Sequence, residues 1–309
     1  MNDAAFSAVS IVGFFARWLT FAGVIVTFGA VVFRFAVVGR ALVSSDVAKS
    51  LNIRAARCAA LAVLLILPGA LARLYFQTAE MRFPDDPWLP LAGTLLTQSS
   101  WGYLWMGQVA LSVIVAIMMQ RASRDDSSSV WRALSVLSFA LLVTPSLASH
   151  AMSAHMSRWL TLPADMLHLT GVSVWIGTLI VMFVASGRIS TTTVTRTIAA
   201  LLVPFSPLAL AGAATVVASG VVSSYAHLGG FGELTRTTYG RLLLAKVALL
   251  LCVAGMGWRN WKRMTPQLDA QGSAPLRRSI VTELAFAVLV LLVTSALVIT
   301  PPPMMHMSN

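Results

Sequence analysis

Long apolar runs alternate with short polar segments along the whole chain of 309 residues. A bilayer core about 30 Å thick requires about 20 apolar residues of α-helix, and runs of that length occur eight times. Because backbone amides in lipid must be hydrogen-bonded internally, these runs predict helices. We place the predicted spans at 11–39, 54–78, 100–120, 131–148, 159–185, 197–225, 239–258 and 279–300. The pattern predicts an all-α, polytopic membrane protein: a bundle of eight transmembrane helices forming a single transmembrane domain over 1–309.

The composition supports this interpretation and excludes several other classes. Hydrophobic residues make up 57% of the chain and charged residues 11%, with a mean hydropathy of +0.80. A soluble domain has roughly 25% charged residues, so this chain has too little polar surface for a soluble enzyme or a disordered protein. The two cysteines, Cys58 and Cys252, lie in apolar runs without CxxC spacing, which argues against a disulfide framework or a zinc site.

The net charge of +11 comes from basic clusters between the spans, so we expect no nucleic-acid partner and instead read the charge as membrane topology. The segments near 40–57, 121–132, 186–196 and 259–278 are basic, whereas 79–98 contains Glu80, Asp85 and Asp86 beside Arg82. The positive-inside rule places the basic segments in the cytoplasm and both termini outside it.

With this topology all five histidines lie on the outer side, and two clusters there combine histidine with methionine. The segment before the fifth span reads SHAMSAHMSRW, the tail reads PPPMMHMSN, and His227 follows the sixth span. Thioether and imidazole donors without thiolates or carboxylates suit copper: Cu(I) is favoured and Cu(II) can bind to imidazoles. The candidate ligands are His150, Met152, His155, Met156, His168, His227, Met304, Met305, His306 and Met307.

The fifth span contains an ionisable pair, Asp165 and His168, in the sequence PADMLHLTGVSVWIG. Residues three apart share a helix face, and Met166 is offset from Asp165 by about 100°. Such a pair inside a membrane is a functional candidate unless it only neutralises another charge, and Lys246 of the seventh span is the expected partner. Asp165 could also orient the imidazole of a ligating His168, so both roles stay open.

The same residues carry a family resemblance. The stretch from His150 to Trp175, together with FSPLALAGAATVVASGVVSSYAHLG and TTYGRLLLAKVALLL, resembles the copper resistance protein D (CopD) family over about 140–265. The resemblance implies a bacterial inner-membrane protein that handles copper, with a periplasmic copper carrier of the CopC type as partner. The family pattern falls on His150, Asp165, His168, Trp175, Tyr239, Gly240 and Lys246.

The leading hypothesis is transport of copper from the periplasm to the cytoplasm rather than enzymatic catalysis. His168 would hold the ion at the mouth of the bundle, and Asp165, Met166, Trp175, Tyr239 and Lys246 would surround the ligands. The chain contains no GxxxxGK[ST] nucleotide-binding loop. Two alternatives remain: a copper-binding docking partner or sensor without transport, and a b-type haem electron carrier, which would need paired axial histidines on facing spans.

Overall fold

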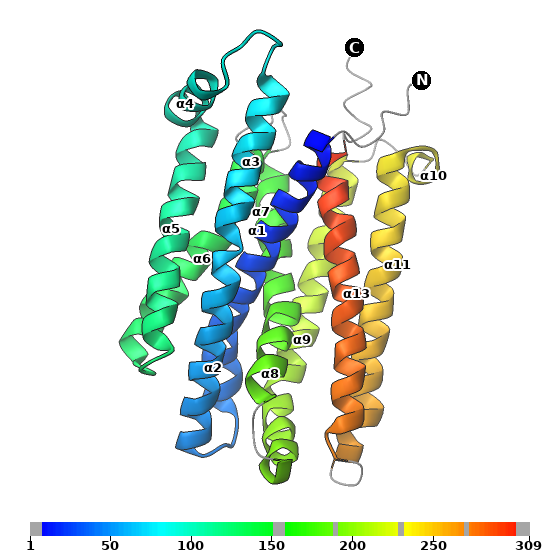
Figure 1. Ribbon diagram of the computed structural model, residues 1–309. Coiled ribbons are helices and arrows are strands. Elements are labelled where there is room, and N and C mark those ends of the chain that lie inside the picture. The colour runs from blue at the N-terminus through cyan, green and yellow to red at the C-terminus, as the bar shows by residue number, and fades with distance from the viewer. Residues whose placement is uncertain (1–7, 151–157, 188–190, 228–231, 269–271, 301–309) are drawn as a thin grey trace.

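The computed structural model describes residues 8–150, 158–187, 191–227, 232–268 and 272–300. All regular structure in these ranges is helical, and eight of the helical segments are long and apolar enough to cross a membrane. This confirms the predicted all-α bundle (Figure 1). The start of the first helix and the end of the last helix lie at one end of the bundle, here called the terminal end. The opposite end, where Arg34, Arg54 and Arg277 lie, is called the basic end.

The first four spans are formed by α1 (Ala8–Val32) continued by η1 (Phe33–Val37) and η2 (Val38–Arg40), by α2 (Ser45–Leu64) with α3 (Ile66–Met81), by α5 (Ser100–Ala122) and by α6 (Ser128–His150). The last four are formed by α7 (Arg158–Val172), η3 (Ser173–Gly177) and α8 (Thr178–Ser186), by α9 (Thr191–His227), by α11 (Thr238–Arg259) with η4 (Asn260–Met264) and η5 (Thr265–Gln267), and by α13 (Ala274–Ile299). Two short helices, α4 (Trp88–Gln98) and α10 (Glu233–Arg236), lie at the terminal end (Figure 1).

Several basic segments that the sequence assigned to loops are helical. The second span begins at Ser45 rather than near 54, because the Ser44 hydroxyl accepts a hydrogen bond from the Val47 amide and caps the helix. The seventh span likewise continues through η4 and η5 to Gln267. The hydropathy pattern marks where the apolar part of a helix ends, whereas the helix itself extends into the polar region beyond the membrane.

The first span lies at the centre of the bundle, with α1 packing against α2, α3, α6, α8, α13 and η3. Its crossing with η3 depends on two glycines. A Cβ on Gly29 would lie 2.3 Å from the backbone carbon of Gly177, and one on Gly177 would lie 2.2 Å from the Ile25 carbonyl oxygen. Because these contacts are with backbone atoms, the two helices can approach this closely only where side chains are absent.

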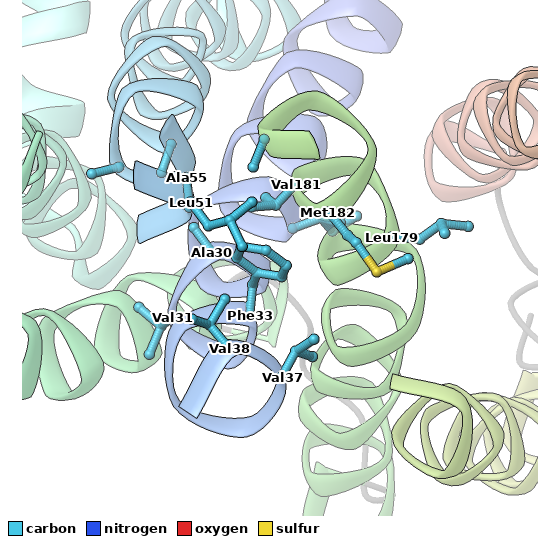
Figure 2. Close-up of a cluster of buried hydrophobic side chains, with 14 of the residues drawn as sticks. Ala30, Val31, Phe33, Val37, Val38, Leu51, Ala55, Leu179, Val181 and Met182 are labelled. Carbon is cyan, nitrogen blue, oxygen red and sulfur yellow. The ribbon is translucent and has the colours of Figure 1, made fainter. Parts of the chain in front are cut away.

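Part of the apolar core lies where the end of the first span meets α2 and α8. Phe33, Leu51 and Val181 are fully buried there, and Figure 2 shows these side chains converging. Small residues such as Ala30 and Ala55 let the helices pack closely around them. This packing joins the first two spans to α8.

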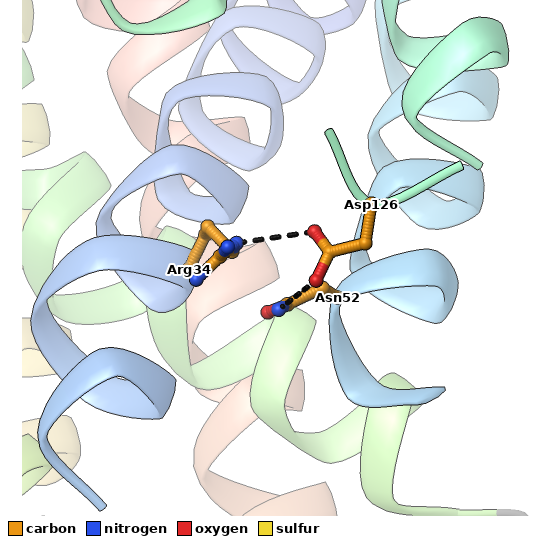
Figure 3. Close-up of polar contacts among 3 residues, drawn as sticks. All are labelled: Arg34, Asn52 and Asp126. Carbon is orange, nitrogen blue, oxygen red and sulfur yellow. Dashed lines mark hydrogen bonds and ion pairs between the residues drawn. The ribbon is translucent and has the colours of Figure 1, made fainter. Parts of the chain in front are cut away.

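Polar contacts at the basic end tie the spans together. Asp126, in the α5–α6 connection, accepts a hydrogen bond from Arg34 Nε at 3.2 Å and another from Asn52 Nδ2 at 2.8 Å (Figure 3). Arg54 donates to the carbonyl of Ala185, in the last turn of α8, at 3.1 Å. Arginines that the sequence analysis treats as topology signals therefore also join neighbouring spans. At the end of α8, the positive charge of Arg54 lies at the negative end of the helix dipole.

Candidate metal-binding site at the terminal end

The candidate site is built on the antiparallel pair α7 and α9, which pack against each other. Gly171 and Gly212 make this contact close: a Cβ on either residue would lie 2.9 Å from the carbonyl oxygen of the other. From this contact toward the terminal end, residue numbers fall along α7 and rise along α9. The side chains of the two helices therefore meet in successive pairs toward the terminal end.

Two polar pairs link these helices within the membrane-spanning part. His168 Nδ1 lies 3.1 Å from Ser219 Oγ, and Ser223 Oγ donates to Asp165 Oδ1 at 3.3 Å. Asp165 and His168 are three residues apart on α7, and their serine partners are four apart on α9, so each pair occupies one face of its helix. The prediction that Asp165 and His168 share a face is confirmed, and the shared face is directed at α9.

The hydrogen bonds around His168 favour one tautomer of its imidazole. Ser219 Oγ also donates a 2.6 Å hydrogen bond to the Thr215 carbonyl oxygen, which suits a tautomer in which His168 Nδ1 carries the proton and donates to Ser219 Oγ. A neutral imidazole with its proton on Nδ1 carries a free lone pair on Nε2. Hydrogen bonding of one ring nitrogen while the other binds a metal is the usual arrangement of histidine ligands. With its proton on Nδ1, His168 could ligate a metal through Nε2.

The seventh span brings two further polar side chains to this region. Lys246 of α11 interacts electrostatically with both His168 and Asp165, and Tyr239 interacts electrostatically with Asp165. His168 and Lys246 each lie eight residues inside their spans from the terminal end, counted from Leu160 and Thr238. At 1.5 Å per residue both are about 12 Å deep. Lys246 is thus close enough to Asp165 to interact with it electrostatically, and their pairing stays a prediction.

The start of α11 fixes where Tyr239 stands. Thr237 Oγ1 caps the helix by accepting from the Gly240 amide at 3.0 Å. A Cβ on Gly240 would lie 2.2 Å from the Glu233 carbonyl oxygen, because α10 folds back onto this turn. The glycine of the Tyr-Gly-Arg sequence is therefore required by a close backbone approach, and that approach anchors the turn that carries Tyr239.

Of the two other residues expected around the metal, Trp175 lies farther from the polar pairs, whereas Met166 directly follows Asp165 in α7. Trp175 is 6% exposed within the π-helical turn η3, and its Cβ lies 3.1 Å from where a Cβ on Gly212 would be. It packs on α9 about two turns deeper than the His168–Ser219 pair. Met166 is half-buried next to Asp165 and about 100° around the helix from it. Trp175 thus supports the α7–α9 contact below the site.

Most of the predicted copper ligands fall outside the described residues: Met152, His155, Met156, Met304, Met305, His306 and Met307. His150 and His227 end α6 and α9, but their side chains are also outside what is described. In the described part of the chain, no three His, Cys, Asp or Glu side chains gather closely enough to hold a metal ion. The described residues thus offer one imidazole with a neighbouring carboxylate, and the wider ligand set stays a prediction.

The two serines of α9 were not among the residues predicted for the site. Ser219 and Ser223 lie four residues apart in the segment SGVVSSYAH, and each contacts an ionisable residue of α7. Hydroxyl groups at this spacing on an otherwise apolar span favour a polar partner on the facing helix. That spacing could have identified α9 as the neighbour of α7.

Comparisons with known proteins agree with this architecture. A family model described as "Copper resistance protein D-like, N-terminal domain" matches residues 8–159, and the model "Copper resistance protein D" matches 199–297. The "Copper transport protein CutJ" of Bacillus subtilis (strain 168) is 26% identical over 219 residues, covering 67% of this chain and 38% of that protein. "Copper resistance protein D" of Pseudomonas syringae pv. tomato is 28% identical over 215 residues, covering 66% of this chain and 69% of that protein. No solved structure matches the chain.

The eight candidate spans define a multi-pass membrane protein, and its similarities are to proteins of copper resistance and copper transport. Matches to both family models, one in each half, extend well beyond the motif-bearing stretch at 140–265. The chain belongs to the copper resistance protein D family. It spans only 38% of the length of CutJ, so the whole activity of that longer protein is not transferred here.

Proposed function

We propose that this protein binds copper at its terminal end and conducts it across the bacterial inner membrane, from the periplasm to the cytoplasm. The observation that carries the proposal is the intramembrane pair of His168 and Asp165, whose side chains contact Ser219 and Ser223 of α9. In this proposal Nε2 of His168 is the metal ligand. A polar group at this depth is costly unless it faces the bundle interior or a path for an ion. The relative named as a copper transport protein supports the same interpretation.

Copper would first be captured outside the membrane by the His150–Met156 segment, with the Met304–Met307 tail as a second donor group and His227 as a further ligand. Thioether and imidazole donors favour Cu(I), and a periplasmic carrier of the CopC type is the proposed source of the ion. The ion would then pass to His168 Nε2. An ion can move on only if each site releases it, so a small number of strong ligands at His168 suits conduction rather than storage.

The membrane potential supplies a direction for this movement. An interior-negative potential favours inward motion of a monovalent cation by about 2.3 kcal/mol per 100 mV. Entry of Cu(I) therefore needs no nucleotide hydrolysis, in keeping with a sequence without a nucleotide-binding loop. The proposed activity is passive transport without an enzymatic step.

The test is copper uptake into sealed proteoliposomes that enclose a copper-responsive dye, with an imposed interior-negative potential. Replacing a residue that only hydrogen-bonds to a metal ligand costs about 10–100-fold in affinity or activity. Because His168→Ala removes the proposed ligand itself, it should lower uptake at least tenfold. His168→Gln keeps an amide that can reach Ser219 but has no imidazole nitrogen to bind copper. It should therefore be as inactive as His168→Ala. The control is Ser138→Ala, which removes a buried α6 hydroxyl that lacks a hydrogen-bond partner among the described residues.

The alternatives give different results in the same preparation. Full uptake by His168→Ala would remove this residue from the path. Copper binding by the wild-type protein without uptake would favour a docking partner or sensor. A Soret band in the purified protein would support the haem carrier instead.

A further inference from the structure

A basic pocket lies at the other end of the bundle, between η4 with the end of α11 and the start of α13. Its volume is about 700 Å³. Arg259, Arg263 and Arg278 line it together with the hydroxyl residues Ser279 and Thr282. No acidic side chain is among the described residues that line it. Three guanidinium groups around one hollow favour an anion, and planar guanidinium donors match phosphate oxygens in particular.

A buried chain of hydrogen bonds fixes one wall of this pocket. Arg259 Nη2 donates to Ser279 Oγ at 2.7 Å, Ser279 donates to Asn260 Oδ1 at 2.5 Å, and Asn260 Nδ2 donates to Glu283 Oε2 at 2.9 Å. Ser279, Asn260 and Glu283 are 6%, 7% and 3% exposed. The Glu283 carboxylate is therefore turned into the protein interior, and the Arg259 guanidinium is positioned by a neutral hydroxyl. This arrangement orients Arg259 in advance and leaves the pocket positive.

The surroundings place this pocket at the depth of lipid headgroups. Trp258 and Trp261, 59% and 44% exposed, stand beside it on the same helical segment, and Lys262 lies 5.4 and 4.5 Å from their ring centres. Exposed tryptophans with basic side chains at the end of a span are typical of the membrane interface. Met264 and Pro275 add apolar surface to the pocket lining. An occupant with a phosphate group and an apolar body matches both features.

We propose that this pocket binds the phosphate headgroup of an anionic phospholipid in the leaflet at the basic end. The proposal is independent of copper transport, since it depends only on the charge, the hydrogen-bond chain and the interfacial position of the pocket. The phosphate would be contacted by the three arginines, with Ser279 holding Arg259 in place. The glycerol and acyl region would lie along Met264 and Pro275.

The experiment measures binding of phosphatidylglycerol to the full chain in detergent by native mass spectrometry, with phosphatidylcholine and inorganic phosphate as separate arms. A charge-assisted hydrogen bond contributes about 1.5–3 kcal/mol, which corresponds to about tenfold or more in affinity. The variant R259Q/R263Q/R278Q should therefore weaken phosphatidylglycerol binding by at least about tenfold. The matched control is R121Q/R124Q/R132Q, three exposed arginines of the α5–α6 region at the same end, which should leave binding nearly unchanged.

Equal losses in the two triple variants would overturn the proposal, because nonspecific charge would then explain binding. Inorganic phosphate that binds while phosphatidylglycerol does not would also overturn it, and so would equal binding of phosphatidylcholine. Ser279→Ala keeps all three arginines but frees Arg259, and we expect it to weaken binding several-fold. This variant keeps the proposal testable if the triple variant fails to fold.

Discussion

Gly171 of α7 and Gly212 of α9 pack backbone against backbone, and neither has room for a Cβ beside the carbonyl oxygen of the other. The contact sets the distance between the helices that carry the two polar pairs. His168 and Asp165 reach Ser219 and Ser223 only because α7 and α9 are this close at the next turns. The geometry of the candidate copper ligand thus depends on two residues that have no side chain.

Substituting Gly212 with leucine should separate these helices. Overpacking a close contact typically costs about 1–3 kcal/mol, so we expect a lower thermal unfolding temperature in detergent together with reduced copper uptake. Gly255→Leu is the matched control, because a Cβ at Gly255 meets no atom within 4 Å. Wild-type stability and uptake in Gly212→Leu would show that the close approach is not needed.

Asp126 should be important for stability and not for copper. Asp126→Ala would remove the acceptor for both Arg34 and Asn52, and Asn52 is only 1% exposed. Hydrogen bonds to a charged group contribute about 1.5–3 kcal/mol, so unfolding should occur at lower temperature or denaturant concentration. The neighbouring Asp125→Ala changes an exposed carboxylate and serves as control. Equal stability of the two variants would mean that this ion pair contributes little.

The number and order of the spans could be predicted from the sequence because bilayer thickness sets a minimum length for each apolar run. Their ends could not, since polar turns continue the helices past the membrane, as at Ser45 and Gln267. The short helix α4 was also missed: its 11 residues are too few for a span, and it depends on packing against α5. Hydropathy therefore defines the membrane crossings better than the helices that make them.

The candidate site was predictable in part, through residues whose cost in a membrane is evident. Asp165, His168 and Lys246 stand out as ionisable residues in apolar runs, and the structure brings them together. Their contacts with Ser219 and Ser223 depend on which helix faces which, and that is decided by Gly171 and Gly212. Neighbour relations between spans are a tertiary property that periodicity in one segment does not specify.

The Met and His clusters should account for most of the copper bound outside the membrane. A variant with His150 and His155 changed to Gln and Met152 and Met156 changed to Leu keeps size but removes the soft donors. Metal analysis of the purified protein should then find less copper per chain than in the wild type. Met81→Leu with Met106→Leu, two exposed methionines of α3 and α5, is the control. An unchanged copper content would exclude this segment as a binding site.

The carboxylate of Asp165 should support copper uptake by balancing the charge of Lys246 beside His168. Asp165→Asn would leave the Lys246 ammonium without its carboxylate neighbour beside His168, which should repel a copper cation. An unpaired charge inside a membrane costs about 2.5–3.5 kcal/mol. If even half of this cost opposes the entry of the copper cation, uptake should fall by about tenfold or more. Adding Lys246→Met removes the unbalanced charge and should restore most of the uptake, a coupling that a double-mutant cycle measures directly. If the double variant stays as inactive as Asp165→Asn, the carboxylate acts on copper itself and not through Lys246. Thermal unfolding of the same variants in the absence of copper separates a loss of transport from a loss of fold.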